Sequence, residues 1–442
     1  MNLRRSVVFL AGLLLSACQQ LPSSIRPNAT PTAEPPPTST LASLTPTVTP
    51  HEVEAVPTRI ERVDGSSSMR LSYECLEVTG MQPESTTASG TLVIHSSEVG
   101  ENDYLLDLTS MTPTRESIGL TAVVSPDNRK LAVVVDNQIE IRDANWNLLS
   151  SFPKEADWQI ERWLDGYQLL IDVGQNAPQA QSWRLPQLLV VNATTGESTL
   201  AFDATSIPGI QDRYDPSLDF GSPSRLVPDS SLSVMIFPAR GDADEVPVVL
   251  WDLERHVEIG RLTNLGPFGG TPTWSPDGSK AVVAAPIRFT TDKGAFDNLA
   301  GEVSVGGAEL LSISRQGKVR RLSYVTSLVI AAPSAPAWSP DGRFLAYWLA
   351  VRDDANYPGE RLAVVDTETG LVTNYCVAGY RREQDGQSPA PIWSPDGKWI
   401  ALTVPNATDV GQTDILLVDL AEKRASQVAD HATLLGWMRL SP

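Results

Sequence analysis

The fold is decided by one pentapeptide that occurs three times, as Trp274-Ser-Pro-Asp-Gly278, Trp338-Ser-Pro-Asp-Gly342 and Trp393-Ser-Pro-Asp-Gly397. Proline presets φ at the first central position of a turn, aspartate tolerates the next position, and glycine adopts the left-handed conformation that ends it. An apolar run typical of a buried strand follows each copy: KAVVAA, FLAYWLAV and WIALTV. The pattern therefore predicts a hairpin turn leading into a strand. The residues assigned a structural role in these turns are Trp274, Asp277, Gly278, Trp338, Asp341, Gly342, Trp393, Asp396 and Gly397.

Weaker copies of the turn lie upstream. Val124–Asn128 and Leu226–Ser230 keep the proline and aspartate, and Trp163–Gly166 is one residue shorter. A second apolar run, a polar turn and a short polar strand follow in each unit. Units that recur every 20 to 50 residues or so predict stacked repeats. Four antiparallel strands in each unit predict an all-β chain folded as a β-propeller.

The two ends of the repeat array indicate how the ring closes. Thr91–His95, Tyr104–Leu108 and Thr114–Ile118 read as the second to fourth strands of a blade that lacks a first strand. Leu434–Pro442 reads as a first strand with no blade after it. We expect the C-terminal strand to complete the N-terminal blade, which removes exposed sheet edges. This arrangement predicts seven blades of about 50 residues each, and six or eight blades remain alternatives.

The pentapeptide turns resemble the WD40-like (PD40) repeats of the TolB-type β-propeller family, which also occur in the propeller domains of prolyl-oligopeptidase relatives. The resemblance runs from about residue 90 to the C-terminus and implies architecture, not activity. Proteins of the TolB type carry an α/β domain before the propeller, whereas here a proline-rich segment leads almost directly into strands. The peptidases carry a serine nucleophile in a GxSxG elbow, and this sequence has no such pentapeptide.

The N-terminus resembles a bacterial lipoprotein signal peptide. Arg4 and Arg5 precede an apolar core at Val7–Leu15, and a small-residue tetrad ends at Cys18. The apolar core is about half of what a bilayer-spanning helix requires. The resemblance implies removal of residues 1–17 and lipidation of Cys18, which would anchor the chain on the extracytoplasmic side of a membrane in the bacterial cell envelope.

The segment after Cys18 changes composition sharply. Residues 19–50 contain 8 Pro, 7 Thr and 4 Ser, with few large apolar side chains. Such a segment cannot bury enough surface to offset the cost of ordering its backbone. We interpret residues 18–60 as a disordered tether and residues 61–442 as the propeller domain.

Charge and residue counts exclude several classes of protein. A formal net charge of −19 argues against binding to nucleic acid. Only three Cys and four His occur, and the His are far apart in the sequence, so we expect no metal site and no cofactor. No catalytic constellation is predicted. Cys75 and Cys376 form a candidate disulfide in an exported protein, with two free thiols as the open alternative.

Loop length predicts where binding takes place. First–second and third–fourth turns fall at one end of the blades, and second–third and fourth–first loops at the other. The second set contains the insertions, and long loops on a rigid scaffold commonly carry binding residues. Aromatic and arginine side chains dominate interface energetics. The candidate contacts in those loops are Trp183, Tyr214, Phe268, Arg288, Phe289, Tyr357, Tyr380, Arg381 and Arg382.

These features favour a lipid-anchored, non-catalytic module that binds an envelope protein or a glycan. The alternative is an envelope hydrolase or lyase whose carboxylates, drawn from several blades, meet at the channel, so enzymatic activity is left open. Ionisable side chains with shifted pKa values around the channel would favour the enzyme. An aromatic patch at the long-loop end would favour the binding module.

Overall fold

The structure is a computed structural model that describes residues 71–80, 87–96, 103–115, 118, 122–173, 187–203, 227–238, 248–262, 272–286, 308–323, 325, 331–351, 359–379, 388–406, 408–409 and 411–440. All of them lie within the unit Ala55–Pro442. Regular structure in this part of the chain consists of strands alone. Nothing in these residues forms a helix long and apolar enough to cross a membrane.

The strands form seven sheets, and the predicted β-propeller with seven blades is confirmed. Blade 1 contains β30 (Ala432–Met438), β3 (Thr91–Ser96), β4 (Tyr104–Asp107) and β5 (Thr112–Arg115), and blade 2 contains β6 (Val123–Val124), β7 (Leu131–Val135), β8 (Gln138–Arg142) and β9 (Leu148–Pro153). Blade 3 contains β10 (Trp158–Trp163), β11 (Gln168–Val173), β12 (Gln187–Asn192) and β13 (Ser198–Asp203), and blade 4 contains β14 (Val227–Pro228), β15 (Val234–Pro238), β16 (Val248–Asp252) and β17 (Val257–Leu262). Blade 5 contains β18 (Thr273–Trp274), β19 (Lys280–Pro286), β20 (Ala308–Ser314) and β21 (Val319–Arg321). Blade 6 contains β22 (Ala331–Trp338), β23 (Phe344–Val351), β24 (Glu360–Asp366) and β25 (Val372–Ala378). Blade 7 contains β26 (Ile392–Trp393), β27 (Trp399–Pro405), β28 (Thr413–Asp419) and β29 (Arg424–Ala429).

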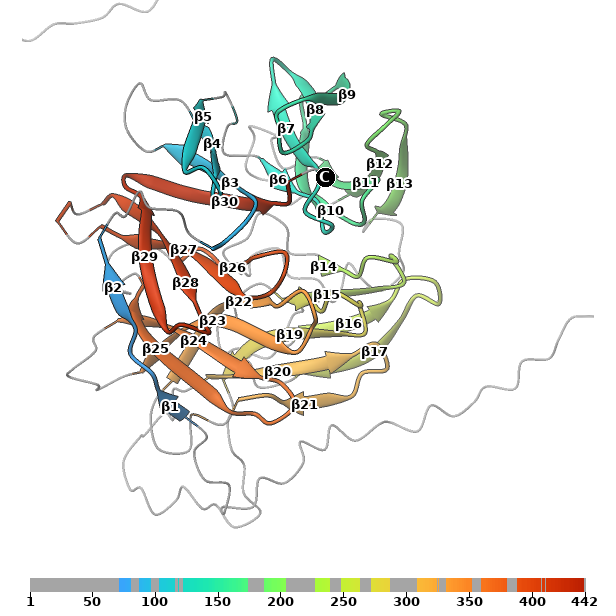
Figure 1. Cartoon of the computed structure of the whole chain (residues 1–442). Coiled ribbons are helices and arrows are strands. Elements are labelled where there is room, and N and C mark those ends of the chain that lie inside the picture. Colours follow the sequence, from blue (N-terminus) through green and yellow to red (C-terminus); the bar gives the residue numbers. More distant parts are fainter. Residues whose placement is uncertain are drawn as a thin grey trace, which may run out of the picture. The chain divides into compact units, whose positions relative to one another are not determined.

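The C-terminal strand closes the ring, as predicted. In Figure 1 the red β30 lies beside the blue β3, and the two strands pair antiparallel from Thr91 with Met438 to Ser96 with Ala432. The indole N–H of Trp437 also donates a hydrogen bond to the carbonyl of Ser89, 3.1 Å away. The last strand of the chain is therefore the inner strand of the first blade. The fourth strand of this blade is β5, which begins two residues before the predicted strand.

Hydrophobic packing runs around the whole ring. Seven clusters of buried side chains each join two neighbouring blades. Leu417 of blade 7 packs with Leu92 of blade 1, for example, and Leu310 of blade 5 packs with Tyr347 of blade 6. The second and third strands of the blades are covered by neighbouring blades on both faces, which explains why they read as nearly continuous apolar runs.

Antiparallel pairing gives the blades two distinct ends. First–second turns, such as Ser275–Ser279, and third–fourth turns, such as Asp366–Gly370, lie at one end of the blades, which we call the turn end. We call the loop end the opposite end, where second strands finish and third strands begin, as at Pro405 and Thr413.

Two further strands cover the outer edges of blades 6 and 7. β1 (Leu71–Tyr73) pairs parallel with β25, and β2 (Glu77–Thr79) pairs parallel with β29. Figure 1 shows both blue strands beside the orange and red edges. We call residues 71–79 the strap. The sequence did not predict it, because neither short strand belongs to a repeat and its partners lie about 300 residues away along the chain.

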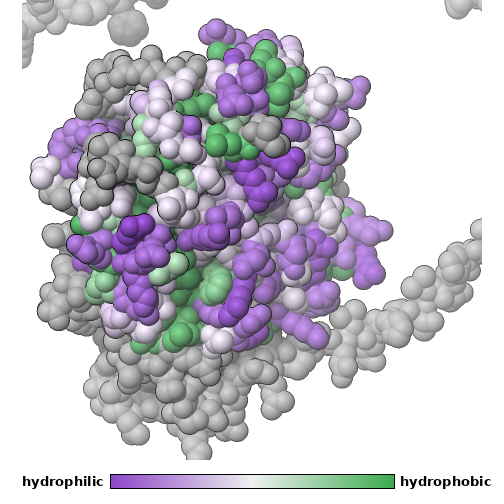
Figure 2. Space-filling model, in the orientation of Figure 1, coloured by the Kyte–Doolittle hydropathy of each residue, from purple (hydrophilic) through white to green (hydrophobic). Residues whose placement is uncertain are grey.

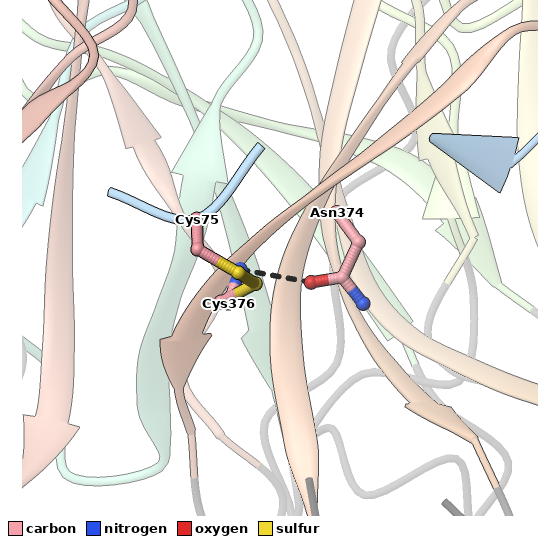
Figure 3. Close-up of a disulfide and its surroundings, with 3 residues drawn as sticks. All are labelled: Cys75, Asn374 and Cys376. Atoms are coloured by element: carbon pink, nitrogen blue, oxygen red, sulfur yellow. Dashed lines mark hydrogen bonds between the residues drawn. A yellow bond between two sulfur atoms is a disulfide. The ribbon is translucent and has the colours of Figure 1, made fainter. Parts of the chain in front are cut away.

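A disulfide fixes the strap to blade 6. Cys75, between β1 and β2, is bonded to Cys376 of β25 (Figure 3). On either side of it, the N–H groups of Glu74 and Leu76 donate to the carbonyls of Asn374 and Tyr375. The chain crosses blade 7 on its way from blade 6 to blade 1 by pairing with the outer strand of that blade.

Candidate functional site

The turn end uses one hydrogen-bond pattern in four blades. The serine hydroxyl donates to the aspartate carboxylate at 2.5 to 2.6 Å. The same carboxylate accepts the N–H two residues further on, and the serine oxygen accepts the N–H five residues after it. The turns that share these bonds begin at Ser125, Ser275, Ser339 and Ser394. Their aspartates are therefore occupied in holding the turn.

These bonds shift the pKa of two of the turn carboxyls. The hydrogen bond from Ser275, followed by that from the N–H of Ser279, lowers the pKa of Asp277. Burial alone would raise the pKa of Asp396, but the hydrogen bonds from Ser394 and from the N–H of Lys398 outweigh it and lower the pKa. Both side chains are charged at neutral pH for a structural reason.

The glycine and tryptophan of the repeat join neighbouring blades. Gly342 and Gly397 have φ of +71° and +73°, and a Cβ at either would lie 3.7 Å from the proline of the preceding turn. The tryptophan indole N–H donates to a backbone carbonyl of the preceding blade at 2.8 to 3.2 Å. The tryptophans that do so are Trp163, Trp274, Trp338 and Trp393. The tryptophans thus join neighbouring blades, whereas the glycines supply the left-handed conformation that the turn requires.

The candidate contacts in the long loops lie outside the described residues. These are Trp183, Tyr214, Phe268, Arg288, Phe289, Tyr357, Tyr380, Arg381 and Arg382. Cys18 also lies outside them. The predicted binding face and the lipidation site therefore remain predictions.

One polar site stands out on the inner strands. In the part of the chain that the structure describes, β10 of blade 3 is the only inner strand with ionisable side chains, Glu161 and Arg162. A β-bulge falls at this point, between Ile160 and Arg162. Bulges re-aim side chains and are common next to functional sites. Oε1 of Glu161 and Nη2 of Arg162 are buried and have no hydrogen-bond partner among the described residues.

Burial and neighbouring charges shift the pKa values of both side chains. Burial, with a further contribution from the charge of Asp172, raises the pKa of Glu161 to about 8. Burial also lowers the pKa of Arg162 to about 10, although the charges of Glu161 and Asp229 oppose it. A carboxyl that titrates near pH 8 can hold or release a proton at neutral pH. This pair is therefore the strongest candidate site among the described residues.

Asp229 joins blades 4 and 5 near this site, and its charge also acts on Arg162 of blade 3. Its carboxylate is buried in the first turn of blade 4 and accepts bonds from the hydroxyl of Ser231 and the N–H of Val234. Arg315 of blade 5 reaches across to pair with it and donates to the carbonyl of Gly278. Burial would raise the pKa of Asp229, but these hydrogen bonds and the Arg315 charge lower it. Asp229 is an acceptor with a structural role.

Buried carboxylates that were not predicted from the sequence also lie at the loop end of five blades. Glu309 of blade 5 accepts hydrogen bonds from Arg321, Ser323 and the N–H of Val325. Glu360 of blade 6 accepts one from Ser334 at 2.9 Å. The five residues are Asp103, Asp172, Glu309, Glu360 and Asp414. Their pattern is visible in the sequence, because an acidic residue lies at or just before the start of an apolar third strand in four blades. These residues are Asp103, Glu309, Glu360 and Asp414.

Histidines do not assemble a metal centre in the described residues, where no group of three or more His, Cys, Asp or Glu is placed to hold an ion. His95 pairs with Asp103 at 2.5 Å at the loop end of blade 1. His256 lies in a turn of blade 4, and His431 lies between β29 and β30.

Exposed apolar side chains are concentrated on outer strands. Leu148 and Leu149 of β9 and Leu200 of β13 are more than half exposed. On the face shown in Figure 2, hydrophilic and hydrophobic side chains are interspersed.

Comparison with known proteins finds similarity to solved structures at low sequence identity. No protein-family model and no curated protein matches the chain. Among solved structures it is similar to TolB from Acinetobacter baumannii, at 12% identity, over 78% of this chain and 82% of that chain, with a TM-score of 0.40. An oligogalacturonate lyase from Vibrio parahaemolyticus matches at 11% identity over 78% and 87%, with a TM-score of 0.44. The Cps50 (Swd1) β-propeller domain from Myceliophthora thermophila matches at 11% over 77% and 97%, with a TM-score of 0.40. Likeness at this level carries no information on activity, substrate or partner.

Proposed function

We propose that this chain is an extracytoplasmic, lipid-anchored β-propeller that binds an envelope protein or glycan without chemical turnover. The observation that carries the location is the disulfide between Cys75 and Cys376. Disulfides persist in exported proteins and are rare in reducing compartments. The bond therefore supports the export that the N-terminal sequence predicts on independent grounds.

The contrast between the two ends of the blades supports the binding role. At the turn end, the repeat residues are occupied by bonds within turns and between blades. The insertions connect strands at the loop end, and the nine aromatic and arginine candidates belong to those insertions. Binding residues are commonly on long loops of a rigid scaffold.

The location is tested by fractionating cells that produce the full chain or the Cys18→Ser variant. The full chain should sediment with membranes and carry lipid at Cys18 in the mass spectrum of its N-terminal peptide. The Cys18→Ser variant should be soluble and unlipidated, because one acyl chain or none does not anchor a protein stably. A full chain without lipid, or a membrane-bound Cys18→Ser variant, would contradict the anchor.

The binding role is tested by affinity capture from detergent-solubilised envelope. A variant with Tyr357, Tyr380, Arg381 and Arg382 changed to alanine should lose the captured partner. The matched control changes Arg320 and Arg343, which lie toward the turn end, and should retain it. Equal capture by both variants would place the binding surface elsewhere.

Glu161 is the specific observation that favours the second candidate, an envelope hydrolase or lyase. A general acid with a pKa near 8 suits such chemistry. Against it, the inner strands in the described part of the chain do not contribute carboxylates from several blades. Release of fragments from envelope glycans by the full chain, abolished in Glu161→Gln, would favour the enzyme over the binding module.

A further inference from the structure

The strap is attached to a ring that is complete without it. All seven blades contain four strands of their own, and β30 closes the ring through β3. β1 and β2 are fifth strands, added to the outer edges of blades 6 and 7. Losing these two strands would therefore leave the sheets of the ring intact.

Few contacts besides the disulfide attach the strap. Each of its strands contributes only three paired residues. Leu71 and Leu76 are partly buried against neighbouring clusters, whereas Tyr73 and Val78 are 47% and 54% exposed. The ion pair between Lys423 and Glu74 is exposed at both ends, and such pairs contribute little. Segments with few buried apolar contacts open at low cost.

Solvent reaches the disulfide. Cys75 is exposed and Cys376 is partly buried in β25. Figure 3 shows the bond lying between the strap and the outer strand of blade 6, with the backbone N–H of Cys376 donating to the side-chain oxygen of Asn374 at 2.9 Å. Cys376 has φ of +62°, a conformation that L residues with a side chain adopt only at some cost. An exposed disulfide at a strained backbone position is the labile kind.

We propose that the Cys75–Cys376 disulfide is an exchangeable latch, whose reduction by a dithiol frees the strap and uncovers the edges of β25 and β29 while the ring stays closed. A thiolate of the dithiol attacks Sγ of Cys75, the more exposed of the two residues, and displaces the thiolate of Cys376. The second thiol of the reductant then resolves the mixed disulfide. Two electrons and two protons pass to the cysteines, and the reductant becomes a disulfide.

Release of the strap would leave hydrogen-bonding groups on the edges of β25 and β29 without their present partners. The carbonyls of Asn374 and Tyr375 lose the donors from Glu74 and Leu76. The hydroxyls of Thr373 and Ser426 lose their bonds to Ser72 and Thr79. Unpaired strand edges accept an added strand, and the strap itself pairs with these edges in parallel. Reduction would therefore leave the edges of β25 and β29 without the strands that cover them.

Hydrogen–deuterium exchange of the full chain, with and without dithiothreitol and with free thiols counted, tests the latch. Reduction should speed amide exchange in residues 71–80, 372–378 and 424–428 by about tenfold or more. Exchange in β3, β30 and the inner strands should not change. Unchanged exchange in the strap after both thiols are free would overturn the proposal. Faster exchange throughout the ring would also overturn it, since the bond would then support the whole fold.

Two variants show whether the effect belongs to this bond. A chain with Cys75→Ser and Cys376→Ser should exchange like the reduced chain and should not respond to dithiothreitol. Leu76→Ala keeps the disulfide and weakens a contact of the strap, so its exchange should still respond to the reductant. A chymotrypsin-like protease provides a second readout, because cleavage after Tyr73 or Leu76 should follow reduction. Resistance of the doubly substituted chain to both measurements would overturn the latch.

Discussion

The two ends of the propeller are built on different principles. At the turn end, four blades repeat the same three hydrogen bonds, all within a few residues of one another. At the loop end, Glu309, Glu360 and Asp414 occupy similar positions at the start of a third strand, but each has different partners. The repeated end sets the architecture, and the varied end can differ from blade to blade without disturbing the ring. We therefore expect functional residues at the loop end, where the blades differ from one another.

The two ends also differ in how deeply their ion pairs are buried. At the loop end, the Arg321 side chain is 5% exposed and pairs with a fully buried Glu309. At the turn end, the Arg343 side chain is 48% exposed and pairs with Asp366 at 2.8 Å. Breaking a buried pair leaves an uncompensated charge in a medium of low polarity, whereas water replaces an exposed partner. The individual bonds at the loop end should therefore matter more to stability than those at the turn end.

Removing the closing strand should have the largest effect, because both ends exist only in a closed ring. Deleting residues 432–442 removes β30 and uncovers the edge of β3. It also removes Leu434 and Trp437 from the cluster between blades 7 and 1. Thermal unfolding followed by circular dichroism should lose its cooperative transition. Deleting residues 441–442 alone is the control and should preserve it, and a cooperative transition in the longer deletion would contradict closure by β30.

The sequence predicted this closure because its evidence is local and repeated. A strand missing from the first blade and a spare first strand at the C-terminus suffice, together with the turn chemistry of proline, aspartate and glycine. The strap was not predicted for the opposite reason. Leu71-Ser-Tyr73 matches no repeat, and its pairing with Val372–Asn374 depends on how the whole ring brings distant segments together.

A pair of arginine substitutions tests the energetic contrast between the ends. Arg321→Met should destabilise the fold by about 3–5 kcal/mol, because it leaves Glu309 buried without its counter-charge. Arg343→Met removes an exposed pair and should leave the denaturation midpoint almost unchanged. Urea unfolding of the two variants measures both. Equal midpoints would show that burial does not distinguish the two ends. If Arg321→Met does not fold, Glu309→Gln with Arg321→Met should recover stability.

Substitution of Glu161 should change the stability of the fold by an intermediate amount that depends on pH. Its pKa is 4.5 when unfolded and about 8 in the fold, because burial disfavours the charged form. The folded state therefore binds the extra proton, and the stabilisation is complete below pH 4.5 and lost as the pH rises through 8. Glu161→Gln removes the titration and should be more stable than the parent at pH 9, by roughly 2 kcal/mol. Urea midpoints at pH 5, 7 and 9 measure the difference, and parallel profiles would contradict it.

This site also shows what sequence analysis could not supply. Glu161 and Arg162 stand inside a strand between Trp158 and Trp163, and the pattern there indicates only a weaker copy of the repeat. Their importance comes from the bulge and from the burial of both side chains, neither of which can be read from spacing. The disulfide was foreseen as a candidate from the even cysteine pair in an exported chain, while its role in holding two added strands required the fold.

The smallest expected effect is at the turn end, where it is present at neutral pH and disappears in acid. The pKa values of Asp277 and Asp396 are lowered from 3.8, so their contribution to stability is present above that pH and is lost as the pH falls through their folded values. Asp277→Asn with Asp396→Asn should lower stability at pH 7 by about 1 kcal/mol for the pair, since both side chains are partly solvated. The two chains should converge as the pH falls below the lowered pKa values of these two carboxyls. Glu254→Gln with Glu422→Gln, at two exposed turn positions, controls for the change of two units in net charge. A deficit in the double variant that does not shrink as the pH falls would show that the carboxylate charge does not hold these turns. The contrast between a turn end held by repeated charged hydrogen bonds and a varied loop end would then fail.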